Sequence, residues 1–514
     1  MLLHLKSLAY IEMLLILGIL LFRTALRPTN RSIIGSKAVT LTLLTPVVAL
    51  TCGNALIFYL YLMSAVAFTS RSRSELCATY LMMLPLTPAL GQEIGAGGAY
   101  LLPLSTIFAM NFGALLGFSF LQRERVAWRG ILDFGAVMFV VLFVYIDGRD
   151  LGLTSFLRSS IVFVVQLGAP YIVMSRGVAR REDVNRVLLR LAYAGTLCAI
   201  VALFQTTRHW VLYQSFNDAL NIREALGSST LYVRGGHLRT GGTLVDYSAA
   251  GVFLACVLVV IPGLWQQFRR AWGCVVIVAL LGGLFATQSR GAWVAAGGGI
   301  AIICIYRGYI TRGIGLLAVA SIGQLALPEI LAPTSNLAET MGAGGGSIGS
   351  TEYRKNLLDS GLRQIMAHPL LGQPPRQLAS SMPEMIQGQH FVDFVNTHLY
   401  VAMAAGVPWF VVWFLIWMTP ILLVWRNRPR GQARQSVDLA EMPMAMIMTA
   451  MLALTFTSTI DRNLCWPAIA LGLISPCIVL RNATRGSLWQ SSVAPVARLS
   501  TQANASSMPP SLQA

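Results

Sequence analysis

Residues 271–306 read AWGCVVIVALLGGLFATQSRGAWVAAGGGIAIICIY, two apolar runs joined by the short turn Ser289-Arg290-Gly291. Arg290 is the only charged residue in this stretch. Apolar runs of about 17–20 residues are long enough to cross the hydrocarbon core of a bilayer as helices. The stretch therefore predicts two membrane-spanning helices, with one guanidinium group held in the turn that joins them.

Similar apolar runs recur along the whole chain of 514 residues, of which 55% are hydrophobic and 11% are charged, with a mean hydropathy of +0.64. Soluble domains carry roughly 25% charged residues, and disordered chains combine low hydrophobicity with many charges, so both classes are excluded. We expect an all-α polytopic membrane protein with about 14 transmembrane helices, within a range of about 12 to 15. The runs are 8–22, 38–68, 75–90, 98–121, 131–146, 158–175, 187–206, 244–265, 271–288, 292–306, 311–331, 397–425, 440–460 and 464–481.

The run 38–68 is too long for one straight helix, because Pro46 and the sequence Cys52-Gly53-Asn54 interrupt it. These breaks predict either a kinked span or a tight hairpin. The whole pattern divides the chain into six parts: N-terminal transmembrane helices at 1–206, a periplasmic loop at 207–243, transmembrane helices with the Ser-Arg-Gly turn at 244–331, a large and partly helical periplasmic loop at 332–396, C-terminal transmembrane helices at 397–481 and a disordered cytoplasmic tail at 482–514.

Basic residues outnumber acidic ones, 38 to 21, for a formal net charge of +17. No nucleic-acid-binding motif is visible, so we assign most of the excess to the positive-inside rule rather than to nucleic acid. Seven Arg clusters fall on one side of the membrane if each run from residue 75 onward crosses once, and that side is then cytoplasmic. This predicts a multi-pass membrane protein with these clusters on its cytoplasmic side. The clusters are Arg71/Arg73, Arg123/Arg125/Arg129, Arg176/Arg180/Arg181/Arg186, Arg269/Arg270, Arg307/Arg312, Arg426/Arg428/Arg430/Arg434 and Arg481/Arg485.

The Arg residues expected on the opposite side are the informative ones, because the positive-inside rule does not explain them. An intramembrane or interfacial charge is costly and indicates a functional site by default. The alternative to a functional role for each of these Arg residues is that its side chain snorkels to lipid headgroups or pairs with a local acidic residue. Since Arg forks match phosphate oxygens, a group of them predicts a phosphate or diphosphate ligand. The candidate residues are Arg234, Arg239, Arg290 and Arg354.

Four segments taken together resemble the O-antigen ligase/polymerase superfamily of bacterial envelope enzymes. Residues 239–251 (RTGGTLVDYSAAG) are similar to its Arg-x-x-Gly-Thr-Phe stretch, and residues 286–293 (ATQSRGAW) resemble its Ser-Arg-Gly turn. Arg354 followed by residues 366–372 (MAHPLLG) looks like its amphipathic periplasmic helix ending in a Pro-x-x-Gly turn. Residues 395–408 (VNTHLYVAMAAGVP) resemble its His-Asn-x-Tyr-Leu helix start that ends in Gly.

The last segment departs from the family pattern. With Asn396 and Gly406 aligned, the position of the family's catalytic His holds Val395, and His398 falls one helical turn later. Some polysaccharide-polymerase-like members share the Val-Asn-Thr sequence, which favours a polymerase over a ligase.

The resemblance implies a multi-pass protein of a bacterial inner membrane that carries out inverting, metal-independent glycosyl transfer in the periplasm, with no cofactor. The donor would be an undecaprenyl-diphosphate-linked glycan, and the acceptor a glycan or lipid A–core. Arg239, Arg290, Arg354 and Arg234 would bind the diphosphate, where charge grows as the glycosidic bond breaks. A base must take the proton of the acceptor hydroxyl. The candidates are His398, His390, Asp393 and Glu384.

Two other classes of function compete with this one. A flippase or other transporter of lipid-linked oligosaccharides would carry its charges near the bilayer midplane on broken helices, whereas here they lie in outer loops and at helix ends. A non-catalytic scaffold of envelope assembly would not need four ordered motifs.

Overall fold

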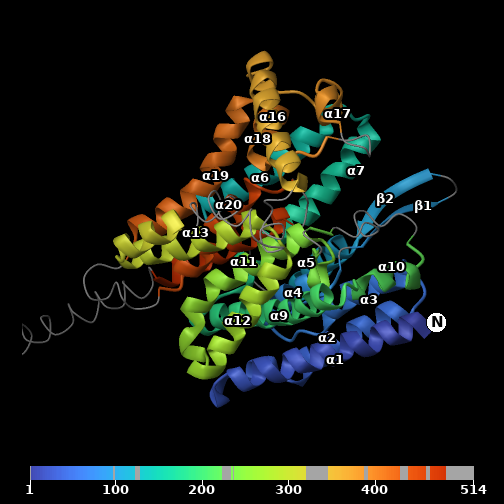
Figure 1. Ribbon diagram of the computed structural model, residues 1–514, viewed down its shortest axis with the longest axis vertical. Coiled ribbons are helices and arrows are strands. Elements are labelled where there is room, and N and C mark those ends of the chain that lie inside the picture. Colours follow the sequence, from blue (N-terminus) through green and yellow to red (C-terminus); the bar gives the residue numbers. More distant parts are fainter. Residues whose placement is uncertain are drawn as a thin grey trace, which may run out of the picture.

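The computed structural model describes residues 2–88, 90–96, 99–121, 128–222, 233–234, 237–319, 345–386, 392–428, 438–458 and 463–481. These residues are almost entirely helical, as predicted (Figure 1). Within them, seven helices are long and apolar enough to cross a membrane, or eight if one bent pair counts as a span. Five more apolar helices have 10–17 residues. The all-α membrane class is confirmed, but the expected count of about 14 spans is not.

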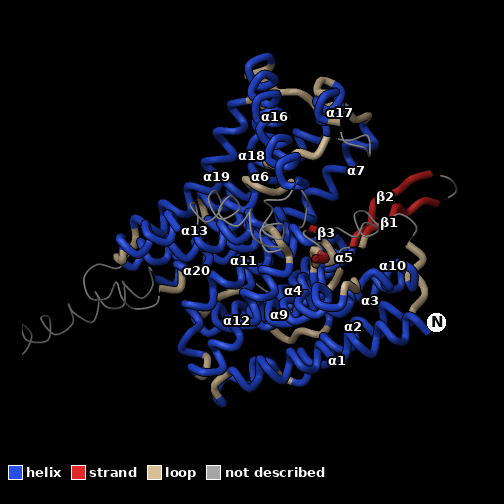
Figure 2. The backbone as a smooth tube through the Cα atoms, viewed as in Figure 1, coloured by secondary structure: helices blue, strands red, loops and turns tan. Residues whose placement is uncertain are grey.

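The N-terminal part consists of helices and one strand pair that ends where α5 begins (Figure 2). Its elements are α1 (Leu2–Ala25), α2 (Ser36–Thr51), α3 (Ala55–Phe68), α4 (Arg73–Leu86), β1 (Gly91–Ala96), β2 (Ala99–Ser105), α5 (Thr106–Leu121), α6 (Ile131–Gly148), α7 (Leu153–Phe163), α8 (Ala169–Gly177) and α9 (Arg181–Arg208).

The C-terminal part carries the segments that resemble the family. Its elements are α10 (Ser215–Ala219), β3 (Val233–Arg234), β4 (His237–Leu238), α11 (Tyr247–Leu264), α12 (Arg270–Ala286), α13 (Arg290–Arg307), α16 (Gly345–Ala367), α17 (Pro375–Ser380), α18 (Thr397–Ala405), α19 (Val407–Arg426), α20 (Glu441–Leu454) and two further helices, Ile310–Val319 and Asn463–Arg481.

The long run 38–68 forms a tight hairpin rather than a kinked span. The chain leaves the helix after Thr51 and re-enters it at Ala55, where the side chain of Asn54 caps α3 by accepting a bond from the amide of Leu56. The hydroxyls of Thr45 and Tyr61 lie 3.2 Å apart across the two helices. Pro46 is accommodated inside α2, so the break comes from Gly53, whose φ of +65° suits the turn.

The expected helix at 98–121 is wrong in its first part. Residues 99–105 form β2, which pairs antiparallel with β1 in a register that sets Gly91 opposite Ser105. Pro103 explains the difference, because proline within a helix removes a backbone donor and clashes with the preceding turn. The hydroxyl of Thr106 donates to the carbonyl of Pro88 and closes the base of the strand pair, where α5 begins.

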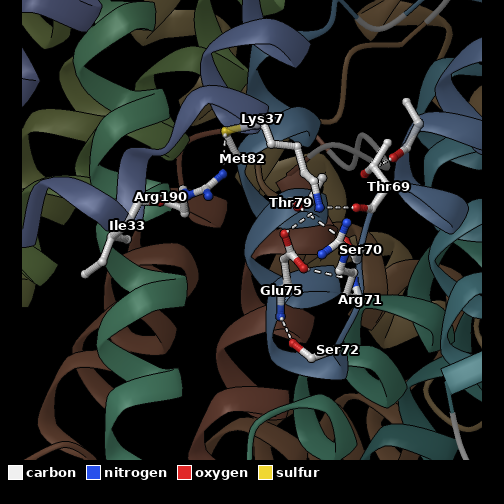
Figure 3. A network of polar contacts seen from close by, with 11 residues as sticks. Ile33, Lys37, Thr69, Ser70, Arg71, Ser72, Glu75, Thr79, Met82 and Arg190 are labelled. Atoms are coloured by element: carbon white, nitrogen blue, oxygen red, sulfur yellow. Dashed lines mark hydrogen bonds and ion pairs between the residues drawn. The ribbon is translucent and has the colours of Figure 1, made fainter.

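The predicted basic clusters meet at one end of the helical bundle. Near the start of α9, Arg186 donates to the hydroxyl of Ser74. Lys37 of α2 forms an ion pair of 2.9 Å with Glu75 of α4 (Figure 3). Arg176 pairs with Asp133, and Arg481 with Asp438. Arg307 at the end of α13 pairs with Glu441 at the start of α20.

The opposite ends of these helices form a second surface of the bundle. Thr206, near the end of α9, contacts the hydroxyl of Thr240 at 3.1 Å. The start of α13 lies beside Phe456, which follows α20. The segments that resemble the family therefore lie at the end opposite the basic clusters.

Helices α3 and α5 approach each other closely through a Gly-x-x-x-Gly pair. A Cβ on Gly113 would lie 2.5 Å from the carbonyl oxygen of Met63, and one on Gly117 would lie 2.7 Å from that of Ala67. Small residues at this spacing let membrane helices pack backbone to backbone.

We predict that Gly117→Ala lowers stability by about 1–3 kcal/mol, because an added methyl group overpacks this contact. The thermal midpoint in detergent measures the effect. Gly135→Ala on α6 is the matched control, since a Cβ there meets no atom within 4 Å. Equal midpoints for the two variants would contradict the close approach.

Candidate active site

Residues 239–251, the first of the four family-like segments, lead into α11 and begin with Arg239. Two contacts hold the Arg239 side chain in place. The guanidinium carbon of Arg239 lies 3.5 Å from the ring centroid of Tyr247, within the range of a cation–π contact. Its Nη2 donates to the carbonyl of Gln288 at 3.5 Å. Asp246 caps α11 by accepting a bond of 2.8 Å from the amide of Ala249. Arg239 is therefore bound to the turn that precedes Arg290.

Arg290 is the first residue of α13 and is half-buried. The turn that carries it is fixed by the amide of Thr240, which donates to the carbonyl of Ala286 at 3.3 Å. A Cβ on Gly251 would lie 2.9 Å from the Cβ of Ser289, so α11 also packs closely against the turn. The first amides of a helix have no partner within that helix. Backbone donors and a guanidinium thus meet at the start of α13.

Residues 455–458, which follow α20, join the remaining segments. A Cβ on Gly291 would lie 2.3 Å from the Cβ of Phe456. The carbonyl of Phe456 accepts a bond of 3.5 Å from Nη2 of Arg354 on α16. The carbonyl of Thr457 accepts a bond of 3.0 Å from the hydroxyl of Thr397 at the start of α18. One short segment thus touches three of the four family-like segments.

The apolar runs do not predict this connection, because residues 455–458 lie at the end of the apolar run 440–460. The available signal was compositional. The sequence Thr455-Phe456-Thr457-Ser458 places three hydroxyl groups where the apolar run ends.

Asp393 lies where these segments meet. Its carboxylate accepts a hydrogen bond from Ser458. Its backbone is clamped by Tyr353 of α16, whose hydroxyl donates to the carbonyl of Asp393 at 3.0 Å and accepts from its amide at 3.1 Å. Burial raises the pKa of Asp393, the Ser458 bond and the charge of Arg354 oppose that rise, and the charge of Asp246 adds to it. The pKa of Asp393 therefore depends on charged residues of the first and third family-like segments, Asp246 and Arg354.

His398 is held by two protein partners. Nε2 lies 3.0 Å from the carbonyl of Met451, and Nδ1 accepts a bond of 3.0 Å from the indole N–H of Trp413. A carbonyl only accepts and an indole only donates, so the proton sits on Nε2 and the ring is neutral. Both ring nitrogens are therefore occupied. Asn396 caps α18 by accepting bonds from the amides of His398 and Leu399.

The other candidate residues are placed as follows. Arg234 lies in β3, with only its backbone described, and His390 lies outside the described residues. The carboxylate of Glu384 accepts a bond of 3.1 Å from Ser360 and lies 3.8 Å from Arg363, both on α16. Among the residues that the structure describes, no three His, Cys, Asp or Glu side chains are grouped to hold a metal ion.

Two glycines join the third segment to the fourth. A Cβ on Gly372 would lie 2.5 Å from the carbonyl oxygen of Met403, and one on Gly406 would lie 2.5 Å from that of Leu370. Both glycines have positive φ, +62° and +83°. The Pro-x-x-Gly turn and the Gly that ends α18 therefore form a single backbone contact, which explains why both segments end in glycine.

Arg149, which the sequence analysis did not select, locks this contact. Its guanidinium donates to the carbonyls of Leu371 and Ala404 and lies over the ring of Tyr145, with 4.6 Å to the ring centroid. The carbonyl of Ala404 is at the C-terminal end of α18, where positive charge is favourable. Nothing in its local sequence, Asp-Gly-Arg-Asp, distinguishes it from a loop residue.

Residues 275–414 match the family model described as O-antigen ligase. The range contains three of the four segments that carry the resemblance, and the segment 239–251 precedes it. No curated protein matches the chain. The resemblance stated from the sequence is thereby confirmed for this part of the chain.

We expect Arg149→Lys to release the turn at 369–372 from α18. Lysine keeps the charge but loses the planar fork that reaches two carbonyls, and hydrogen bonds to charged groups contribute about 1.5–3 kcal/mol each. The measurement is the rate of limited proteolysis between α16 and α17, together with the thermal midpoint.

Arg376→Lys is the matched control, because Arg376 lies exposed on α17 in the same region. If both variants resist proteolysis as well as the unmodified protein does, Arg149 does not lock the turn.

Proposed function

We propose that this protein transfers a glycan from a lipid-diphosphate donor to an acceptor hydroxyl outside the cytoplasm. The match of residues 275–414 to the family model described as O-antigen ligase supports this proposal. The donor proposed is an undecaprenyl-diphosphate-linked glycan, and the acceptor is a second lipid-linked glycan or lipid A–core. The site would face the periplasm from a bacterial inner membrane, since it lies opposite the basic clusters.

The observation that carries this proposal is the meeting of three Arg-bearing segments at one end of the bundle. Arg239 contacts the carbonyl of Gln288, two residues before Arg290. Phe456 contacts Gly291 and accepts a bond from Arg354. Arg residues brought to one place at a membrane surface suit a diphosphate, whose oxygens accept paired bonds from guanidinium groups.

The proposed chemistry is a single displacement with inversion at the anomeric carbon. Negative charge builds on the diphosphate oxygen as its bond to the sugar lengthens. Donors that are already in place lower the energy of this state more than that of the bound substrate. Arg290 is best placed for this role, because its side chain begins at the N-terminus of α13, where the helix dipole also favours an anion. No metal ion is needed for this step.

We predict that Arg290→Ala and Arg290→Lys each reduce glycan transfer by about 10²–10³-fold, the usual cost of removing one such donor. Lysine fails because it offers a point charge without the fork. Transfer is measured in membranes that contain equal amounts of inserted protein. Arg312→Lys at the basic end is the control, since Arg312 is exposed there. Full activity of Arg290→Ala would falsify the leaving-group role.

A second experiment distinguishes polymerase, ligase and transporter by the lipid-linked glycan that accumulates in cells lacking the protein. Val395 in place of the family's His favours a polymerase, so we expect single repeat units to accumulate on the periplasmic side. Long lipid-linked chains would indicate a ligase, and repeats retained on the cytoplasmic face would indicate a transporter.

A further inference from the structure

Glycosyl transfer to a hydroxyl requires a base, and the position that holds the family's His is occupied here by Val395. His398 is the nearest histidine along the described chain, but both of its ring nitrogens are bonded to Met451 and Trp413. Resting on the proposed function, we propose that Asp393 is the general base that removes the proton from the acceptor hydroxyl.

The geometry around Asp393 suits this role. One carboxylate oxygen, Oδ1, accepts the bond from Ser458, while Oδ2 receives no hydrogen bond from the side chains and amides that the structure describes. Tyr353 holds the backbone on both sides of the residue through its hydroxyl. A base needs a fixed carboxylate with one oxygen left for the substrate, and this arrangement provides both.

The surroundings also connect Asp393 to the proposed diphosphate site. The positive charge of Arg354 on α16 lowers the pKa of Asp393, and the negative charge of Asp246, which precedes α11, raises it. Ser458 follows α20 and is the only hydroxyl bonded to the carboxylate among the described residues. Asp393 therefore lies at the centre of the same set of segments that brings the Arg residues together, whereas Glu384 is engaged with Ser360 and Arg363.

The step balances without another reactant. The acceptor oxygen forms a bond to the anomeric carbon of the donor sugar as its proton passes to Oδ2 of Asp393. The bond from that carbon to the diphosphate breaks, and its electron pair stays on the diphosphate oxygen. Asp393 then gives the proton to water and regains its charge. Because the base must be ionised, the rate rises with pH through the pKa of Asp393.

The test uses the full-length protein in proteoliposomes. The donor is the lipid-linked glycan extracted from cells lacking the protein, and the acceptors are the same lipid-linked glycan and lipid A–core. Asp393→Asn is expected to lower kcat at least 100-fold, while binding of undecaprenyl diphosphate stays within twofold of the unmodified protein. Asp393→Ala is expected to be equally slow and to recover activity with added formate, a small carboxylate that replaces the lost base. Formate rescue shows that the variant is folded.

Ser458→Ala gives an independent readout. The Ser458 bond lowers the pKa of Asp393, so its removal is expected to shift the acid limb of the kcat–pH profile to higher pH. A purely structural role for Asp393 leaves the limb unmoved. His398→Gln, which keeps a donor and an acceptor on one side chain, is expected to retain transfer, as is His390→Ala.

The outcomes separate this inference from the function on which it rests. If the unmodified protein forms no glycan product from this donor, the proposed function fails and the base assignment fails with it. If the unmodified protein is active and Asp393→Asn or Asp393→Ala stays within twofold of it, only the base assignment is overturned. Loss of diphosphate binding in proportion to activity, absence of formate rescue, or inactivation by His390→Ala or His398→Gln would also overturn it.

Discussion

The close contact between Gly291 and Phe456 is the constraint on which the site depends. No side chain larger than hydrogen fits at position 291, because a Cβ there would lie 2.3 Å from the Cβ of Phe456. Gly298 and Gly299 continue the same face of α13 against Leu452 and Thr449 of α20. This glycine-lined contact brings the start of α13, with Arg290, against the end of α20. The carbonyls and hydroxyls of residues 455–458 are then available to hold α16, Asp393 and α18.

A second contact sets the position of α16. Gly372 and Gly406 meet backbone to backbone, and Arg149 binds carbonyls on both sides of the junction. Through it, α16 is held at its C-terminal end by the turn and near its middle by the bonds of Tyr353 and Arg354. The position of Arg354 relative to Arg290 thus depends on a residue of the loop after α6. A site assembled from distant segments needs such supports, because its geometry must hold within about 0.5 Å.

The resemblance could be found in the sequence because its motifs are local. The Pro-x-x-Gly turn and the capping Asn396 each lie within a few residues and have the expected backbone form. The Ser-Arg-Gly motif is equally local, but residues 287–289 form the turn, and Arg290 and Gly291 already belong to α13. The strand pair at 91–105 could not be predicted from the apolar run, because such a run predicts burial but not secondary structure; the one local signal against a helix is Pro103. Arg149 and residues 455–458 were missed because their partners are far away in the chain. The roles of Asp393 and His398 depend on which of their side-chain atoms already form hydrogen bonds within the protein. Sequence spacing does not reveal those bonds.

Composition and periodicity were enough to establish the class of this protein. Hydrocarbon excludes unpaired backbone groups, so an apolar run of about 20 residues that crosses a bilayer is expected to be a helix. The cost of moving charge across a bilayer sorts Arg residues by side. Both constraints act on each residue separately and can be read along a chain. The site required the folded structure, because it depends on contacts between residues far apart in the chain, such as Arg354 with Phe456, 102 positions apart, and Arg149 with Ala404, 255 positions apart. Such contacts follow from how helices with glycine-lined faces pack together. The order of residues along the chain does not specify which helices become neighbours.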